Sequence, residues 1–425
     1  MLRLLFVSLE FTAGTFSGNG IYAASQVQAL ARIGCQMLIL AGKPAGSETT
    51  STSLAFQLIE VELPTWGTLD RSCSWEAFAQ ACGHPDIADR VLAFKPDAAL
   101  GIDWSSLPAF ERLAAALAVH DAQLPYIYMN YRVYARTVSG ADQQWMRSME
   151  LKAMETSALT IVLSNSDESY LQQVMFDPEH DHHDHHQQQR ALQIEVLLPA
   201  LRADMASISL PPDMGPINCP ESQTIYQRFK PEIKRRYLTC CVRLSPEKEP
   251  DRFVDLVYRL HSSSALQRLK VTPLLIGSSK SSYAEGIKAR LRSSGAPCEI
   301  VEQFLGPAEL AEIFSRTRLN IHPCLYDAFG MSIVEAASQG APSLTNEGGS
   351  IGATDLLLGS KGEVIIANLD MPMQELAQMV EVLLSDQAVL LRVGRAAAAK
   401  ARSWTQSHNA SKLHELLQNT CAFGR

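Results

Sequence analysis

Short apolar runs alternate with longer segments of helical periodicity along nearly the whole chain. In the first half, β-type runs occupy 4–8, 36–40, 56–63, 97–102, 125–130, 159–164 and 194–199. The segments between them, such as 21–34 and 105–119, carry apolar residues at helical spacing. Because parallel strands need a crossover between them, this alternation predicts a mostly parallel sheet covered by helices on both faces.

The alternation pauses from about Pro199 to Lys234, a stretch rich in proline and polar residues. It then restarts with β-type runs at 238–244, 271–277, 298–304, 319–324, 342–345 and 363–367. The predicted fold is therefore α/β, with two Rossmann-like domains and an interdomain cleft. We predict an N-terminal domain over 1–198, a linker over 199–235, a C-terminal domain over 236–402 and a C-terminal helix over 403–425. One interpretation is that this helix crosses back to pack on the N-terminal domain.

Composition bounds the possible functions. Hydrophobic residues make up 46% and charged residues 19% of the 425 positions, so a large core can form. The formal net charge of −8 argues against a bulk electrostatic grip on nucleic acid, and no nucleic-acid partner is expected. Peripheral membrane contact stays open. The apolar start, MLRLLFVSLEF, is interrupted by Glu10, which favours a buried strand over a signal peptide.

The nine cysteines form no CxxC pattern, which favours free thiols in a reducing compartment and predicts a cytoplasmic protein. A biased segment, 177–190, contains five histidines. Clustered His and Asp residues can bind a metal. A solvated loop insertion is the favoured interpretation because the segment implies no fixed geometry.

The segment YDAFGMSIVEAASQG, 326–340, places two acids eight positions apart, Asp327 and Glu335. A helix is expected from about Phe329, so Gly330, Met331 and Ser332 would present free N–H groups at its N-terminus. Such an end favours a phosphate. A carboxylate accepts two hydrogen bonds side by side, so Glu335 suits a ribose diol. The spacing thus suits a nucleotide-sugar, with Asp327 facing the sugar.

Two other loops carry candidate chemistry. CVRLSPEKEPD, 241–251, follows a predicted strand, and its Arg243 and Lys248 could clamp a pyrophosphate, although loop cations are more often ordinary surface charges. EFTAGTFSGNGIY, 10–22, follows the first strand, and Gly14, Gly18 and Gly20 would let a ligand approach the backbone closely. It does not fit a dinucleotide-binding GxGxxG with a following acid.

Together these segments resemble the GT-B glycosyltransferases, specifically the retaining family 4 type (glycosyl transferases group 1). The resemblance is carried by SGNGIYAASQVQALARIGCQMLIL, VLAFKPDAALGIDW, EVLLPAL, CVRLSPEKEPD, LLIGSS, the block VEQFLGPAELAEIFSRTRLNIHPCLYDAFGMSIVEAASQGAPSLTNEGG, and ARSWT. It implies a transferase that moves a hexosyl group from a nucleotide-diphosphate sugar to a hydroxyl acceptor. A UDP-sugar is the first expectation and GDP-mannose the next. The acceptor class stays open among glycans, lipids, protein glycans and small molecules.

The resemblance also implies roles for single residues. Arg243 and Lys248 would bind the donor diphosphate, and Glu335 the ribose. Asp327 takes the place of the first acid of the family's E-x7-E and would contact the donor sugar. The remaining donor-binding residues implied in this way are Gly20, Gly277, Leu305 (in the turn 303–305 that would meet the base), Phe329, Gly330, Met331 and Ser332. No cofactor and no metal is expected, because two cations and a helix end would stabilise the leaving group.

Two departures from the family pattern bear on catalysis. Asn130 stands where the family often has a histidine near the reacting sugar, and an amide cannot act as an acid or base. Asp327 is one methylene shorter than the usual glutamate. In the implied retaining mechanism the diphosphate takes the acceptor's proton, with Asp327, Arg243, Lys248 and Asn130 as the catalytic group. A double displacement would need a carboxylate on the opposite face, for which Asp103 is a candidate.

The acceptor side is less defined. YIYMNYRVYAR, 126–136, holds four tyrosines with Arg132 and Arg136, which suit either an acceptor or ordinary strand packing. Two alternative functions also remain: a catalytically weak GT-B subunit that binds a nucleotide-sugar or a partner, and, more remotely, a sugar-nucleotide 2-epimerase.

Overall fold

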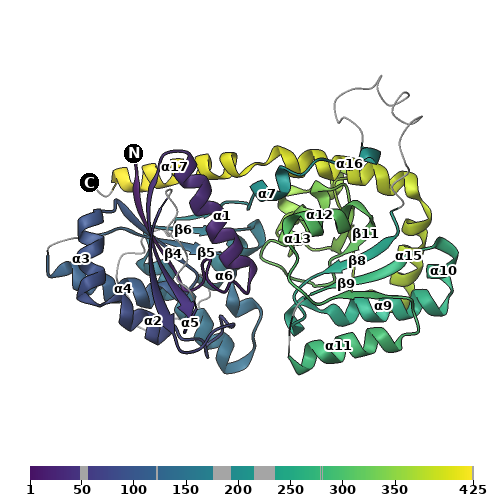
Figure 1. Ribbon diagram of the computed structural model, residues 1–425, viewed down its shortest axis with the longest axis horizontal. Helices are drawn as coiled ribbons and strands as arrows, with labels where there is room; N and C mark the ends of the chain where they lie inside the picture. Colours follow the sequence, from purple (N-terminus) through teal and green to yellow (C-terminus); the bar gives the residue numbers. More distant parts are fainter. Residues whose placement is uncertain are drawn as a thin grey trace, which may run out of the picture. The chain divides into compact units, whose positions relative to one another are not determined.

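A computed structural model describes residues 1–47, 56–120, 123–175, 193–214, 235–277, 279 and 281–423. The chain divides into two compact units, one formed by 1–199 with 406–425 and the other by 200–405 (Figure 1). Each unit is built on a parallel sheet, so the predicted α/β class with two Rossmann-like sheets is confirmed. The histidine-rich segment 177–190 and residues 215–234 of the predicted linker lie outside the described residues.

The first unit contains a sheet whose described strands follow the order β3-β2-β1-β4-β5-β6-β7. These strands are β1 (Arg3–Ser8), β2 (Gln36–Pro44), β3 (Gln57–Leu63), β4 (Ala98–Ile102), β5 (Tyr126–Asn130), β6 (Leu159–Val162) and β7 (Ile194–Val196). The helices are α1 (Gly18–Arg32), α2 (Trp75–Cys82), α3 (Pro85–Phe94), α4 (Ser106–Ala118), η1 (Tyr134–Arg136), α5 (Gly140–Thr156), α6 (Asn165–Met175) and α17 (Gln406–Phe423).

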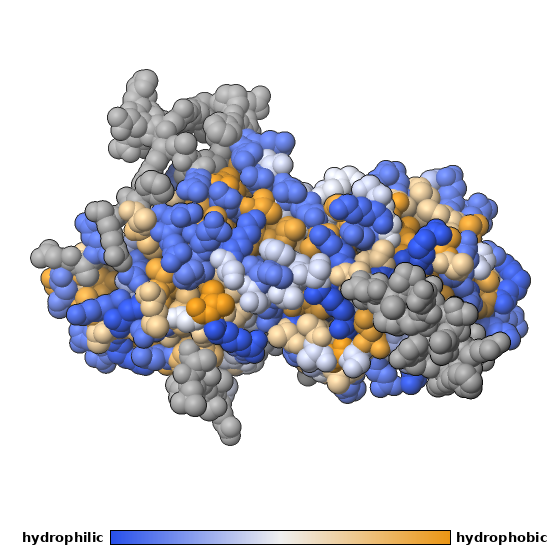
Figure 2. All heavy atoms as spheres, turned by 90° about the horizontal axis from the view of Figure 1, so that it is seen from above, coloured by the Kyte–Doolittle hydropathy of each residue, from blue (hydrophilic) through white to orange (hydrophobic). Residues whose placement is uncertain are grey.

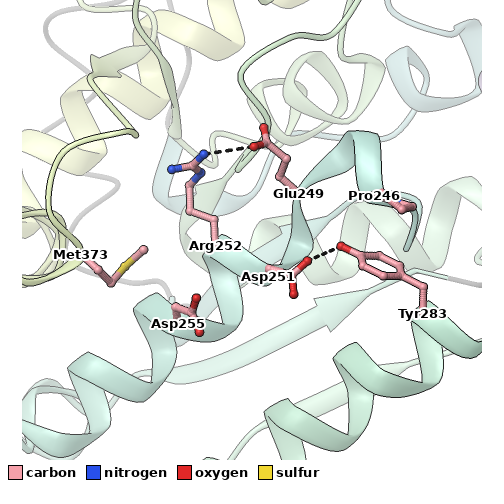
Figure 3. Close-up of a pocket in the computed structure, with 7 residues that line it drawn as sticks. All are labelled: Pro246, Glu249, Asp251, Arg252, Asp255, Tyr283 and Met373. Carbon is pink, nitrogen blue, oxygen red and sulfur yellow. Dashed lines mark hydrogen bonds and ion pairs between the residues drawn. The ribbon is translucent and has the colours of Figure 1, made fainter. Parts of the chain in front are cut away.

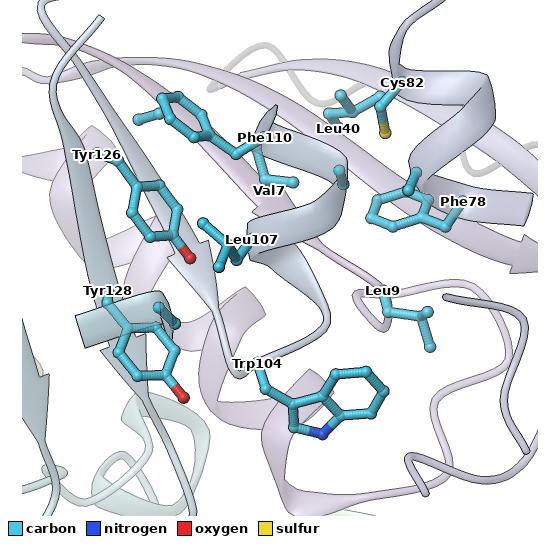
Figure 4. Close-up of a cluster of buried hydrophobic side chains, with 14 of the residues drawn as sticks. Val7, Leu9, Leu40, Phe78, Cys82, Trp104, Leu107, Phe110, Tyr126 and Tyr128 are labelled. Atoms are coloured by element: carbon cyan, nitrogen blue, oxygen red, sulfur yellow. The ribbon is translucent and has the colours of Figure 1, made fainter. Parts of the chain in front are cut away.

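The core of the first unit explains why its central strands are apolar at successive positions. Every residue of β4 and β5 is buried, as expected for parallel strands covered on both faces. Figure 4 shows Trp104, Phe78 and Phe110 in the same buried cluster as Tyr126, which belongs to β5. The Phe110 and Tyr126 rings stack with centroids 4.6 Å apart. Trp104 lies two residues after the end of β4 and is buried in the same cluster, so it is a packing residue.

Helix α17 belongs to the first unit although it follows the whole second unit in sequence. It packs against α1 (Figure 1). The Asn409 side chain donates to Leu198 O at 2.8 Å and to Tyr22 Oη at 3.3 Å, and Lys412 donates to Val196 O at 3.2 Å. These contacts join α17 to α1 and to the end of β7.

The second unit contains a sheet whose described strands follow the order β10-β9-β8-β11-β12-β13. These strands are β8 (Tyr237–Cys241), β9 (Thr272–Ile276), β10 (Glu299–Val301), β11 (Thr317–Ile321), β12 (Ser343–Asn346) and β13 (Ile365–Ala367). The helices are α7 (Ala203–Ala206), η3 (Pro212–Met214), η4 (Pro246–Lys248), α9 (Pro250–Ser262), α10 (Ala265–Leu269), α11 (Ser282–Ser293), α12 (Pro307–Ser315), α13 (Met331–Ser338), α14 (Ala353–Leu356), η5 (Gly359–Lys361), α15 (Met373–Ser385) and α16 (Gln387–Ser403).

Residues 200–214, at the start of the predicted linker, pack on the second unit. The Arg402 guanidinium donates to Ala206 O at 3.2 Å and to Ile208 O at 2.7 Å. Arg235 pairs with Asp213 at 2.7 Å. This packing places Arg202, which directly precedes α7, beside the helix α13 that carries Glu335.

Both sheets reverse their strand order next to the first strand of the unit. In the first sheet the reversal lies between β1 and β4, and in the second between β8 and β11. Ligands of open α/β sheets bind beyond the carboxyl ends of the strands at such a switch point. The loops after β8 and β11 therefore define where a ligand of the second unit is expected.

The face shown in Figure 2 is largely hydrophilic, with hydrophobic residues scattered among the polar ones. Among the described helices, none has both the length and the apolar character that a membrane span requires.

Candidate active site

The loops after β8 and β11 bring one cation and one acid together. The Lys248 ammonium lies 2.7 Å from Asp327 Oδ2, and both side chains are mostly buried. β8 and β11 are neighbours in the sheet, so the loops that follow them emerge at the same edge. The backbone of Asp327 is fixed in turn, since its N–H donates to Ser350 O and its carbonyl accepts from Gly352 N–H, both at 3.0 Å.

His322 and Cys324 complete this cluster. His322 Nε2 lies 3.1 Å from Asp327 Oδ2 and 3.1 Å from Cys324 Sγ. Both His322 and Cys324 are buried. His322 follows directly after the last residue of β11, so strand geometry fixes where its ring points. We call Lys248, His322, Cys324 and Asp327 the Asp327 cluster.

The charges of the cluster stabilise one another. Burial would raise the pKa of Asp327, but Lys248 and His322 together lower that pKa well below its usual range. Burial lowers the pKa of His322, whereas Cys324 and Asp327 raise it, and the result is about 9. Asp327 is thus an anion held by two cationic partners.

The N-terminus of α13 adjoins the cluster. Gly330 precedes the helix with φ of 91°, and a Cβ built there would lie 2.8 Å from Ile333 Cδ1 and 3.6 Å from His322 Nε2. Only glycine fits this conformation without strain. Helix α13 begins at Met331, so the expected start near Phe329 was wrong, and Phe329 instead lies buried just before the helix. The N–H groups of Met331 and Ser332 occupy the first turn, where no helical carbonyl precedes them.

Glu335, on the same helix, is buried beside an arginine that sequence reasoning did not identify. Arg202 Nη1 lies 3.6 Å from Glu335 Oε1. Burial raises the pKa of Glu335 to about 7; Arg202 opposes this rise and Asp204 adds to it. The carboxyl is therefore half charged near neutral pH.

Among the charged residues predicted to bind the donor, Arg243 has the most exposed side chain, at 37%. Its Nη2 donates to Glu247 Oε1 at 2.5 Å, within the same loop as Lys248. A surface ion pair of this kind contributes little to stability, so the Arg243 side chain can exchange partners at low cost. Its predicted role toward a diphosphate stays a prediction.

Gly277 and Leu305 lie at the carboxyl ends of the neighbouring strands β9 and β10. A Cβ on Gly277 would lie 2.4 Å from Val242 O, so a side chain there would collide with the loop that carries Arg243. Leu305 is partly buried, and its neighbour Phe304 is 70% exposed. The sheet thus gathers Gly277, Leu305, Arg243 and the Asp327 cluster along one edge.

In the first unit, the glycine-rich segment differs from expectation. Gly18 and Gly20 lie inside α1, and of the three predicted loop glycines Gly14 alone, with φ of 61°, is in the left-handed region. Gly20 is required by packing, because a Cβ there would lie 2.8 Å from the Glu10 carboxylate. Glu10 Oε1 accepts from Phe16 N and Ser17 N at 2.7 and 2.8 Å, and so organises this loop.

Asp103 is a structural carboxylate in the described unit. Its Oδ1 accepts from Tyr131 N at 2.8 Å, and its Oδ2 accepts from Asn19 Nδ2 at 2.5 Å and from Tyr134 Oη at 2.9 Å. Burial raises the pKa of Asp103 to about 7 against these hydrogen bonds. With 3% exposure, it ties the glycine-rich segment to the end of β5 rather than presenting a nucleophile.

Asn130 and the tyrosines around it belong to the core. Asn130 is fully buried at the end of β5, and its Nδ2 donates to Tyr128 Oη at 3.0 Å. The tyrosines of 126–136 are all buried, so the structure favours packing over acceptor contact for Tyr126, Tyr128, Tyr131 and Tyr134. Arg136 pairs with Asp167 at 2.9 Å.

A second buried acid makes the first unit sensitive to pH. Burial raises the pKa of Glu150 to about 8, although Tyr134 N and Ala135 N donate to it; Asp103 and Asp167 raise it further. A carboxyl whose pKa is higher in the folded state stabilises below its unfolded pKa, and this stabilisation is lost as pH rises through the folded value.

We therefore expect the free energy of unfolding to fall between pH 5 and pH 8, by up to about 1.4 kcal/mol per pH unit for such a group. Glu150→Gln should flatten this slope in urea titrations at several pH values. Glu155→Gln, an exposed change on the same helix α5, is the matched control and should leave the slope unchanged. Parallel slopes for Glu150→Gln and the wild type would contradict the assignment.

A shallow pocket of about 370 Å³ lies beside the loop 241–251 that carries Arg243 and Lys248 (Figure 3). It is lined by Pro246, Glu249, Asp251, Arg252, Asp255, Tyr283 and Met373. Arg252 pairs with Glu249 at 3.1 Å, and Tyr283 donates to Asp251. Asp255 pairs with Arg290, outside the lining, so the polar groups of the pocket already have protein partners. None of the predicted donor-binding residues lines it.

Comparison with known proteins agrees with the fold. Residues 235–386 match the family model described as Glycosyl transferases group 1. The chain is similar in structure to sucrose-phosphate synthase from Thermosynechococcus elongatus, with a TM-score of 0.76 and 14% identity over 99% of this chain and 100% of that one. Among curated proteins, none matches the sequence.

Two further structures extend the likeness. The E. coli trehalose-6-phosphate structure bound with UDP-2-fluoro glucose gives a TM-score of 0.67 at 14% identity, covering 98% of each chain. The UDP-forming α,α-trehalose-phosphate synthase from Burkholderia xenovorans, in complex with glucose-6-phosphate, gives 0.67 at 15% identity over 98% of this chain and 100% of that one.

The chain therefore has the GT-B fold of these glycosyltransferases. Its second unit carries a domain of the Glycosyl transferases group 1 family over 235–386, the part of the chain that holds Arg243, Lys248, Asp327 and Glu335.

Sequence reasoning missed His322, Cys324 and Arg202 as parts of the site. A signal existed for the first two, because they follow the β11 strand and precede Asp327 by at most five residues. Arg202 carried no such signal, since it lies in a segment predicted to be a linker.

Proposed function

We propose that the protein is a retaining glycosyltransferase that moves a hexosyl group from a nucleotide-diphosphate sugar to a hydroxyl acceptor. The observation that supports it most is the Lys248–Asp327 contact beside the N-terminus of α13, within the family-matched residues. This contact brings together the anion proposed to bind the sugar and the cation proposed to bind the diphosphate, four residues before the helix end proposed to bind phosphate.

The chemistry proposed for these residues is stabilisation of the leaving group. As the bond from the sugar to the diphosphate breaks, Lys248, Arg243 and the N–H groups of Met331 and Ser332 stabilise the negative charge that develops. The departing diphosphate takes the proton of the acceptor hydroxyl, and the new bond forms on the face that it leaves. Asp327 orients the sugar through its hydroxyls. The two cations and the helix end supply the charge, so this step requires no metal.

Glu335 is proposed to hold the ribose, and the turn 303–305 the base. UDP is the first candidate nucleotide, because the similar structures include one bound with UDP-2-fluoro glucose and one described as UDP-forming. GDP-mannose is the next candidate. A sugar phosphate is an acceptor to test first, since the Burkholderia structure contains glucose-6-phosphate.

One observation favours a second candidate function. Asn130 is fully buried and bonds to Tyr128, so no acid or base is offered at this position of the described chain. A GT-B subunit that binds a nucleotide-sugar with little turnover would fit that feature.

A panel of UDP-, GDP- and ADP-sugars, each with and without a chelator, separates these functions. Thermal shift reports binding, and release of free sugar or transfer to glucose-6-phosphate reports chemistry. We expect one nucleotide to raise the Tm and its sugar to be released in the presence of chelator. Binding without release or transfer would favour the weak subunit, and no binding by any nucleotide would overturn the donor site.

A further inference from the structure

The Asp327 cluster contains the ligand atoms of a metal site in addition to those of a sugar site. His322 Nε2, Cys324 Sγ and a carboxylate oxygen of Asp327 all lie within 4.8 Å of one another. The two distances from Nε2, to Oδ2 and to Sγ, are each 3.1 Å. We propose that these three groups form an inhibitory site for a borderline-soft divalent cation, Zn²⁺ in particular.

The distances suit zinc. Zinc binds sulfur at about 2.3 Å and nitrogen or oxygen at about 2.0 to 2.2 Å, so tetrahedral ligand atoms lie about 3.4 to 3.6 Å apart. The two distances from Nε2 are within about half an ångström of that spacing. One nitrogen, one sulfur and one oxygen favour zinc over magnesium or calcium, which prefer oxygen alone.

The cluster is accessible to a cation and leaves one coordination position of the ion unfilled by protein. Cys324 and His322 are buried, whereas the side chains of Asp327 and Lys248 are 14% and 17% exposed. A cation can therefore enter past Asp327 and Lys248. Three protein ligands leave the fourth position for water, as in zinc sites that are not purely structural. On binding, the Cys324 thiol and the His322 imidazolium each lose a proton to solvent, and the thiolate and the neutral imidazole Nε2 coordinate the ion.

Bound zinc would oppose the transferase chemistry. Zn²⁺ would hold the carboxylate of Asp327, whose Oδ2 accepts from Lys248 and His322 in the free protein. Two cations cannot share that oxygen without repulsion, so Lys248 would leave it. The sugar-binding anion and the phosphate-binding cation would then be lost together. This consequence rests on the proposed function, whereas binding of the ion does not.

Cobalt replaces zinc as a spectroscopic probe, because a thiolate–Co²⁺ bond absorbs where imidazole and carboxylate ligands do not. The chelator-treated full-length protein should develop this absorption with Co²⁺ and lose it when Zn²⁺ is added. The segment 177–190 contains histidines but no cysteine, so it cannot produce the signal. A variant with these five histidines replaced by serine should keep the band.

Cys324→Ser should abolish the band, and His322→Asn should weaken Co²⁺ binding by at least about tenfold. Cys298→Ser removes a half-buried thiol outside the cluster and should change nothing. Circular dichroism checks that each variant is folded; if Cys324→Ser does not fold, His322→Asn carries the test. A band that persists in a folded Cys324→Ser variant, unchanged Co²⁺ binding by a folded His322→Asn variant, or no band in the wild type, would overturn the site.

Donor hydrolysis then tests the inhibition separately. Zn²⁺ should lower the rate for the wild type, chelator should restore it, and Cys324→Ser should be less sensitive to Zn²⁺. If the protein binds Co²⁺ through Cys324 but shows no activity in any condition, the metal site stands and the proposed function fails. If activity is present and Zn²⁺ does not lower it while the Co²⁺ band is intact, the inhibitory role is wrong.

Discussion

Replacing Lys248 by alanine is expected to lower kcat/KM for donor turnover by about 100- to 1,000-fold, the loss typical of removing one preorganised donor to a developing anion. Lys248 contacts Asp327 at 2.7 Å and lies beside the N-terminus of α13, so it faces the position proposed for the diphosphate. Steady-state kinetics with the donor identified by the nucleotide panel measure the effect.

The control separates this loss from a folding defect. Asp327 keeps its contact with His322 when Lys248 is removed, so its charge retains one partner. The Tm of the variant is measured to check that it is folded at the assay temperature. Lys361→Ala removes an exposed lysine from η5 of the same unit and should leave kcat/KM unchanged. Activity of Lys248→Ala within about threefold of the wild type, far below the expected loss, would rule out a direct role for this cation.

The second large effect is expected at Glu335. Hydrogen bonds to a charged group contribute about 1.5 to 3 kcal/mol, so Glu335→Ala should weaken binding of the free nucleoside diphosphate by about 10- to 100-fold. Isothermal titration measures this change. Unchanged affinity would contradict the ribose assignment, whether or not the protein is an active transferase.

The pH dependence of binding gives a sharper test of the same residue. Burial raises the pKa of Glu335 to about 7, against the opposing effect of Arg202, so the carboxyl is neutral below that pH and charged above it. A carboxylate accepts both ribose hydroxyls, whereas the protonated group offers less acceptor capacity. Nucleotide affinity should therefore fall as the pH drops from 8 to 6.

Glu335→Gln should bind more weakly and lose this pH dependence. Glu375→Gln, an exposed change in the first turn of α15, should keep both the affinity and its pH profile. An identical pH profile in the wild type and in Glu335→Gln would assign the titration to another group.

The order of strands and helices could be predicted because short apolar runs and segments of helical periodicity alternate along the chain. Each predicted strand is present among the described residues, although β11 spans Thr317–Ile321 where the run 319–324 was predicted. The predicted helix start near Phe329 failed for a local reason. Gly330 adopts a left-handed backbone that breaks the helix on its N-terminal side, and periodicity does not report such a conformation.

Contacts between residues far apart in the chain could not be predicted from the sequence. Asp327 and Lys248 were each identified by motif, but their contact arises from the pairing of β8 with β11, which no local pattern encodes. The partner of Glu335 was missed because Arg202 lies in a segment without periodicity. The tyrosines around Asn130 were ambiguous because a buried strand and a sugar-stacking surface favour the same residue types.

The position of α17 makes the first unit discontinuous in sequence, and this bears on how the chain folds during synthesis. Residues 406–425 leave the ribosome after all of 200–405, which takes on the order of tens of seconds at usual elongation rates. Until then the α1 surface that Asn409 and its neighbours cover is exposed to water, and Tyr22 lacks its contact with Asn409. The second unit can therefore complete its fold before the first, although its sheet is translated later.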